Sequence, residues 1–282
     1  MHERWGGRRH VLGSAASAVG AVALVLGSAA CGTPGTVGGR STTTSPETTA
    51  PGSSSTTGPA TSGAASTTTS APPRSLAPYL ALWPFRSWSE VLAWEAGYRS
   101  AGTAPWHLDA GTTAQEFTMQ FLDFGEINTV VRVLTNANGA HVSVGLRTTG
   151  TSVSISAVIH LVRWGSGARA PWEVVGTDDT TLSLTRPVYG ATVSSPLVAG
   201  GSISGVDESV RVDVRQPSST APIGTSCCVP AGGTATPWSA TVTYDGATDP
   251  VLTVVASTGG HVAAVERFAV TGVRPGHGSD AP

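Results

Sequence analysis

Residues Val153–Leu161 read VSISAVIHL, with an apolar side chain at every second position. This period of two is typical of a β-strand with one buried face. The run Val142–Leu146 has the same period, and the turn signal Asn138-Gly139 stands before it. We therefore expect consecutive antiparallel strands. His141 and His160 would lie on the face opposite the aliphatic side chains, as surface or interface residues rather than metal ligands.

Two helices are expected before these strands. Ser87 can cap a short helix over residues 89–98. Thr113-Ala114-Gln115-Glu116 is a capping-box pattern, in which the threonine caps the helix and the glutamate reaches back to it. This helix would end at Gly125. Its apolar face would carry Ala114, Phe117, Phe121, Leu122 and Phe124. With further strands over residues 172–175 and 182–184, residues 75–185 are predicted to be an α+β domain, with helices followed by an antiparallel sheet.

Residues 186–274 show no helical period and consist of short strand candidates separated by turn residues. These candidates are Val193 and residues 197–203, 209–214, 239–244, 251–256 and 261–273. Their spacing predicts an all-β sandwich. Residues 275–282 are expected to be a flexible tail.

The opening of this second domain carries a family resemblance. It reads PVYGATVSSP over residues Pro187–Pro196, and the pair Gly200-Gly201 and the valine-alternating run Asp207–Val212 follow. The pattern resembles the immunoglobulin-like domain associated with bacterial spore germination, which occurs on exported bacterial proteins. The resemblance covers the last third of the chain. It implies an immunoglobulin-like β-sandwich and no catalytic residue. The chain departs from the family at residues 216–236, which we expect to be a long insertion.

The N-terminus has the three-part layout of a secretory signal: a region with three arginines, an uncharged apolar region over residues 11–26, and small residues before Cys31. This ending resembles a bacterial lipobox, which implies cleavage after residue 30 and a lipid on Cys31. Arg8-Arg9 resembles a twin-arginine export signal. Two alternatives stay open: cleavage by ordinary signal peptidase, or an uncleaved membrane anchor. Each of these outcomes exports the rest of the chain.

Residues 32–74 consist almost wholly of Thr, Ser, Pro, Gly and Ala. Such a segment has too little apolar surface to offset the entropy lost on folding. We expect a disordered stalk between the lipidated Cys31 and the folded domains.

The charge pattern excludes several functions. Every basic residue apart from histidine is arginine, so a P-loop lysine and Schiff-base chemistry are excluded. The formal net charge is −2 and the chain has no basic run, which argues against nucleic-acid binding. No cofactor motif is present.

Cys227 and Cys228 are adjacent, and they are the remaining thiols if Cys31 carries lipid. In an oxidising compartment they favour a strained vicinal disulfide. Free thiols or bridges to another chain are the alternatives.

The dipeptide Pro-Trp recurs at Trp106, Trp172 and Trp238, and these rings could line a glycan-binding groove. Trp residues of this kind more often close a core or a domain junction. His107 and Asp109 could offer two metal ligands, but nothing nearby in the sequence supplies a third. We therefore predict no catalytic residue and no metal site.

These observations predict a lipid-anchored, non-enzymatic protein on the outer face of the cytoplasmic membrane. It would bind cell-wall polymer or another envelope protein. The alternative is an exported enzyme of hydrolase type, with a site between the two domains.

Overall fold

The structure of the protein is a computed structural model that describes residues 75–148 and 150–276, without the side chains of residues 206–208. All of the described residues belong to one compact unit. The predicted signal peptide, the lipidation site Cys31, the stalk and residues 277–282 of the tail lie outside the described residues.

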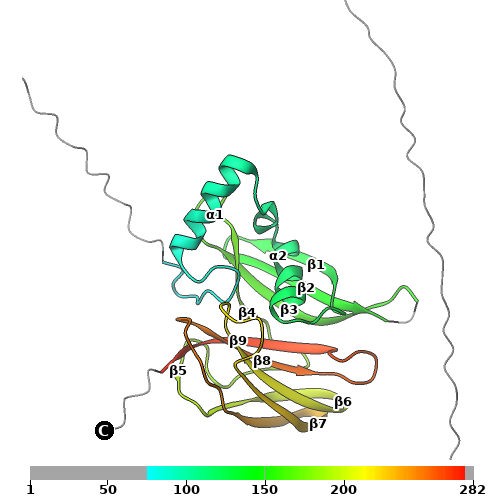
Figure 1. Cartoon of the computed structure of the whole chain (residues 1–282). Coiled ribbons are helices and arrows are strands. Elements are labelled where there is room, and N and C mark those ends of the chain that lie inside the picture. The colour runs from blue at the N-terminus through cyan, green and yellow to red at the C-terminus, as the bar shows by residue number, and fades with distance from the viewer. Residues whose placement is uncertain (1–74, 149, 277–282) are drawn as a thin grey trace, which may run out of the picture. The chain divides into compact units, whose positions relative to one another are not determined.

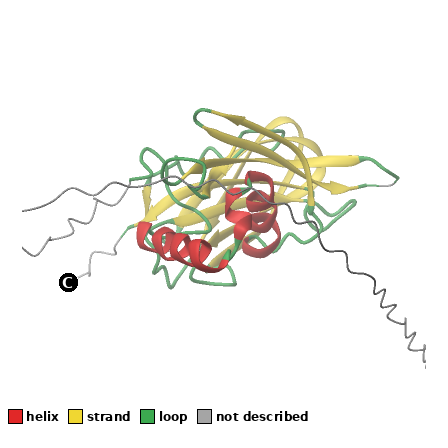
Figure 2. Cartoon of the chain, turned by 90° about the horizontal axis from the view of Figure 1, so that it is seen from above, coloured by secondary structure: helices red, strands yellow, loops and turns green. Residues whose placement is uncertain are grey.

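The described part is mainly β, with few helices and with largely antiparallel sheets (Figure 1). Two short helical pieces, a 3₁₀ turn and a π-helical turn precede the first sheet: α1 (Trp88–Ala101), η1 (Pro105–Leu108), α2 (Ala110–Glu116) and η2 (Phe117–Phe121). The first sheet has the order β1-β2-β3-β4, formed by β1 (Thr129–Asn136), β2 (Gly139–Arg147), β3 (Val153–Arg163) and β4 (Trp172–Thr177). The helices gather on one side of the strands (Figure 2).

Local sequence signals predicted the N-terminal cap of the first helix correctly and that of the second helix wrongly. Ser87 caps α1 as predicted, and its side chain accepts the backbone N–H of Glu90. The predicted start of the second helix at Thr113 is wrong. The N-cap is Asp109, four residues earlier, whose carboxylate accepts the N–H of Thr112, so that the helix begins at Ala110. The predicted apolar face is confirmed, since all five of its members are buried: Ala114, Phe117, Phe121, Leu122 and Phe124.

The hairpin between β1 and β2 turns one residue earlier than predicted. Asn136 pairs with Gly139, so the loop consists of Ala137 and Asn138. The Asn136 side chain accepts the N–H groups of Asn138 and Gly139 at 2.7 and 3.1 Å, which closes the turn through a side chain.

The second sheet has the order β5-β9-β8-β6-β7. Its strands are β5 (Thr192–Val193), β6 (Leu197–Arg215), β7 (Gly224–Val242), β8 (Leu252–Thr258) and β9 (Arg267–Pro275). All of its pairs are antiparallel apart from β5 with β9. Most of residues 216–236, expected to be an insertion relative to the resembled family, is strand in the structure, because Gly224–Thr236 belongs to β7 and pairs with β6.

The strand β8 is buried at every position, because both of its faces are covered. Val254 and Ala256 join the core of the second sheet, whereas Val255 joins the core formed by α2, η2 and the first sheet. Phe268 and Val270 of β9 also belong to that first core. The two sheets therefore share a hydrophobic interior, although the predicted boundary at residue 186 separates them in the sequence.

Residues 182–184 were expected as the last strand of the first domain, but they run beside β6. Ser183 donates its N–H to the Ser202 carbonyl at 2.9 Å, and Leu182 bridges to Ile203. Leu182 and Leu184 belong to the core of the second sheet. The segment thus connects the two sheets and extends the second one.

Candidate functional site

Two histidines stack on the polar face of the first sheet. His141 of β2 and His160 of β3 are directly opposite each other in the strand register. Both side chains point away from the core because their neighbours Val142, Ile159 and Leu161 point into it. The two rings are nearly parallel, with 4.6 Å between centroids and an interplanar angle of 10°.

An acidic residue orients this pair. Asp178 follows β4, and its N–H donates to the Val158 carbonyl at 2.9 Å, which holds the loop against β3. Its Oδ2 lies 2.7 Å from Nδ1 of His141. Both side chains of this pair remain partly exposed. Because Nδ1 of His141 contacts Asp178, Nε2 is the ring nitrogen of His141 that remains to bind a ligand or a water molecule.

His160 of the stacked pair lines an open hollow of about 340 Å³ between the two sheets. Tyr79 stands edge-on to the His160 ring at 5.4 Å. On the other side stands Tyr189, whose hydroxyl accepts the N–H of Leu80 at 2.6 Å. The lining also includes the polar residues Thr177, Asp179, Thr185 and Thr271. We call this hollow, together with His141 and Asp178, the histidine cleft.

A second hollow, of about 560 Å³, adjoins the first at Tyr79 and extends over the end of β3. Asn136, Asn138 and Arg163 contribute polar groups to its lining. The Arg163 guanidinium lies 4.2 Å from the Trp172 ring centroid, and its Nη1 donates to the Ala170 carbonyl at 2.6 Å. Tyr79 thus separates two neighbouring hollows that both carry hydrogen-bonding side chains.

The electrostatics of the cleft favour a neutral second histidine. Burial lowers the pKa of His160, and the nearby His141 lowers it further, while Asp178 opposes the shift. A neutral imidazole can donate one hydrogen bond and accept another. The cleft therefore offers His160 as a neutral partner beside His141, whose Nδ1 contacts Asp178.

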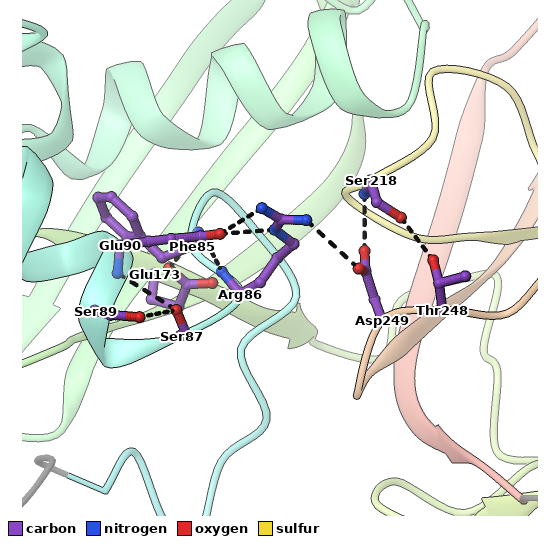
Figure 3. A network of polar contacts seen from close by, with 9 residues as sticks. All are labelled: Phe85, Arg86, Ser87, Ser89, Glu90, Glu173, Ser218, Thr248 and Asp249. Carbon is purple, nitrogen blue, oxygen red and sulfur yellow. Dashed lines mark hydrogen bonds and ion pairs between the residues drawn. The ribbon is translucent and has the colours of Figure 1, made fainter.

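A separate polar network joins the start of α1 to loops of the second sheet (Figure 3). Arg86 lies 2.6 Å from Glu90 and 3.7 Å from Asp249. Asp249 in turn accepts the N–H of Ser218 at 2.8 Å. Because each of these groups already has a partner in the network, we interpret it as a structural link between the sheets.

Glu173 lies beside this network and is fully buried. Burial raises its pKa well above the usual range, the negative charge of Glu90 adds to the increase, and the N–H groups of Phe85 and Trp83 oppose it. Its Oε2 accepts the Phe85 N–H at 3.2 Å. Neither of the two hollows described above is lined by Glu173. We therefore treat it as a protonated structural acid.

The aromatic residues predicted as a binding groove are not assembled into one. Trp172 and Trp238 are buried, with 4% and 3% exposure, and pack in the two different cores. Trp106 is half-buried and stacks on Trp83 at 5.3 Å. The sequence left open a groove and a core position for these rings, and burial confirms the core position for Trp172 and Trp238.

The other predicted residues have separate positions. His107 is buried against Trp106 and Phe85, and burial lowers its pKa to about 4. Asp109 caps α2, so the two do not form a metal site. Cys227 and Cys228 form a disulfide on β7. Within residues 75–148 and 150–276, no group of three or more His, Cys, Asp or Glu side chains is placed to hold a metal ion.

Comparisons of the chain with protein-family models, with curated proteins and with solved structures found no match. Among the described helices, none has both the length and the apolar character that a membrane crossing requires.

Proposed function

We propose that this chain is a lipid-anchored cell-envelope protein that binds a hydroxyl-rich polymer of the cell wall in the histidine cleft. The observation that carries the proposal is the cleft itself, which combines two tyrosine rings with His160, Asp179 and threonine hydroxyls. Flat aromatic faces with a few converging polar groups suit a ring-shaped ligand that carries hydroxyl groups. The hollow is open, which suits a polymer that passes through it better than an enclosed small molecule.

We also propose that residues 186–274 form an immunoglobulin-like module of the kind associated with bacterial spore germination. The opening motif over Pro187–Pro196 supports this proposal. The antiparallel strands β6–β9 around one core support it as well. In this account the module carries the Tyr189 side of the cleft and holds it against the first sheet.

The binding function is tested by cosedimentation of the purified chain with insoluble cell wall. We expect His160→Ala to weaken wall binding by about tenfold, because one or two hydrogen bonds to the ligand and the support for Tyr79 are lost. His261→Ala is the matched control, since His261 is exposed in the β8–β9 connection and lines neither hollow. Equal binding by the two variants would contradict the assignment.

A hydrolase is the second candidate, and the 2.7 Å contact between Asp178 and His141 is the observation that favours it. A carboxylate that orients an imidazole is a common way to prepare a general base. Asp178→Asn separates the two functions. If the cleft only binds, this variant should keep most of the affinity and wild type should release no product from the wall. Release of soluble fragments by wild type, and its loss in Asp178→Asn, would favour the enzyme.

The anchor is tested through Cys31, which lies outside the described residues. We expect Cys31→Ala to move the protein from the detergent-soluble membrane fraction into the medium or into an uncleaved precursor, because the lipidated residue is lost. The intact mass of the wild-type protein should show lipid on its N-terminus. A mature N-terminus with an unmodified Cys31 contradicts the anchor and leaves export and wall binding standing.

A further inference from the structure

The bond between Cys227 and Cys228 joins neighbours in the sequence. A disulfide stabilises a protein mainly when it closes a long loop and thereby restricts the unfolded chain. A bond between adjacent residues closes no loop and restricts little. Neither cysteine belongs to a hydrophobic core, and both are exposed. Stabilisation of the fold therefore does not explain this disulfide.

The register of the second sheet places the pair in a bulge. Val210 pairs with Val229 and Val212 pairs with Ser226, so Cys227 and Cys228 together stand opposite Arg211. A bulge leaves its extra residue without a partner in the strand ladder. Moreover, β7 is the last strand of its sheet in the described part of the chain. The disulfide is therefore accessible from the outer side of the edge strand.

The backbone at the pair is also unusual. Cys228 has a φ of 122°, a region that residues other than glycine rarely adopt. Such a conformation costs free energy and persists only when the surroundings enforce it. Cys228 lies in the covalent ring that the disulfide closes. We expect that opening the ring allows Cys228 to relax toward an ordinary strand conformation.

The disulfide is exposed on an edge strand, it closes no stabilising loop, and Cys228 has an unusual backbone conformation. We therefore propose that Cys227–Cys228 is a reversible thiol–disulfide exchange site. The partner class is a thiol or dithiol outside the membrane, either a small thiol or an exported dithiol protein. This inference does not depend on the wall-binding function.

The exchange proceeds in two balanced steps. A thiolate of the partner attacks one sulfur of the pair, the Cys227–Cys228 bond breaks, and a mixed disulfide forms while the other cysteine leaves as a thiolate and takes a proton. A second partner thiolate then attacks the mixed disulfide. It releases the remaining cysteine and forms the partner's own disulfide. The protein gains two electrons and two protons, and the reverse sequence restores its disulfide.

The test uses the full chain with Cys31→Ser, so that every thiol counted comes from the pair. The folded protein is incubated with reduced glutathione, and free thiols are counted by maleimide labelling and intact mass. We expect both thiols to appear without denaturant, and to disappear when oxidised glutathione is added. The midpoint of urea unfolding should not fall on reduction, because the bond closes no loop and its opening allows Cys228 to relax.

Two variants complete the test. In oxidised glutathione, the Cys227 thiolate of Cys228→Ser should attack the glutathione disulfide, release one reduced glutathione and stop at a mixed disulfide, since no neighbouring thiol can resolve it. The variant with Cys227→Ser and Cys228→Ser should not react. The proposal is overturned if the disulfide is reduced only after the protein unfolds, since structural disulfides of exported proteins resist glutathione. Reduction that unfolds the protein, or two free thiols in the air-oxidised protein, also overturns it.

Discussion

The Glu173→Gln variant is expected to gain stability over wild type as the pH rises. In the folded protein, burial keeps the Glu173 carboxyl protonated far above the usual pKa of 4.5 at which the unfolded chain loses this proton. The unfolded state then binds fewer protons than the folded state. The free energy of unfolding of wild type therefore falls by about 1.4 kcal/mol per pH unit, until the pH passes the folded pKa. Below the unfolded pKa this contribution is fully present.

Glutamine keeps an oxygen that accepts the Phe85 N–H, and it has no proton to lose. Urea unfolding at increasing pH, starting from about pH 5, should show the stability difference widening until the pH passes the raised folded pKa of Glu173. Glu95→Gln is the control, because this partly exposed residue of α1 pairs with Arg99 at the surface. Parallel pH dependences of wild type and Glu173→Gln would show that Glu173 is ionised in the folded protein.

The Gly201→Ala variant is expected to lose about 3 kcal/mol of stability or more, because an added methyl group has no room. A Cβ at this position would lie 2.0 Å from the Ser183 carbonyl oxygen and 2.7 Å from its carbon. These are backbone atoms of the segment that runs beside β6, so they cannot move without breaking the bond from the Ser183 N–H to the Ser202 carbonyl. The variant therefore tests whether residues 182–184 belong to the second sheet.

Gly125→Ala is the matched control for this variant. A Cβ at Gly125 meets nothing within 4 Å, and the residue lies in an exposed turn. Urea unfolding should show a large decrease in the midpoint for Gly201→Ala and a small change for Gly125→Ala. If Gly201→Ala unfolds at the wild-type midpoint, the connecting segment does not pack on β6 as described.

Local signals in the sequence predicted those parts of the fold that depend on neighbouring residues. The period of two over Val153–Leu161 identified β3, and Ser87 identified the start of α1. The second helix was misplaced because two caps compete within a few residues, and the carboxylate of Asp109 prevails over Thr113. Residues 216–236 were expected to be an insertion relative to the resembled family, and no strand was predicted in them. In the protein, most of them form part of β7, which pairs with the long strand β6. This pairing depends on residues that are distant in the sequence, so no local pattern predicts it.

The histidine cleft was likewise only partly predictable from local sequence patterns. The alternation of apolar residues placed His141 and His160 on the polar face of the sheet, and the structure confirms this face. Their stacking depends on the register between β2 and β3, which a single strand does not encode. Asp178 lies 37 residues beyond His141 in the chain, and Tyr189 comes from the second domain. The polar face was therefore predictable, whereas the cleft required the packing of the two sheets.

The central claim is that a wall polymer contacts the protein at the histidine cleft. The most direct measurement is a titration of the full chain with soluble wall fragments, followed through the side-chain NMR signals of individual histidines. We expect the signals of His141 and His160 to shift together and saturate, while those of buried His107 and of His261 stay in place. Saturable shifts confined to His107 or His261, with His141 and His160 unchanged, would contradict it.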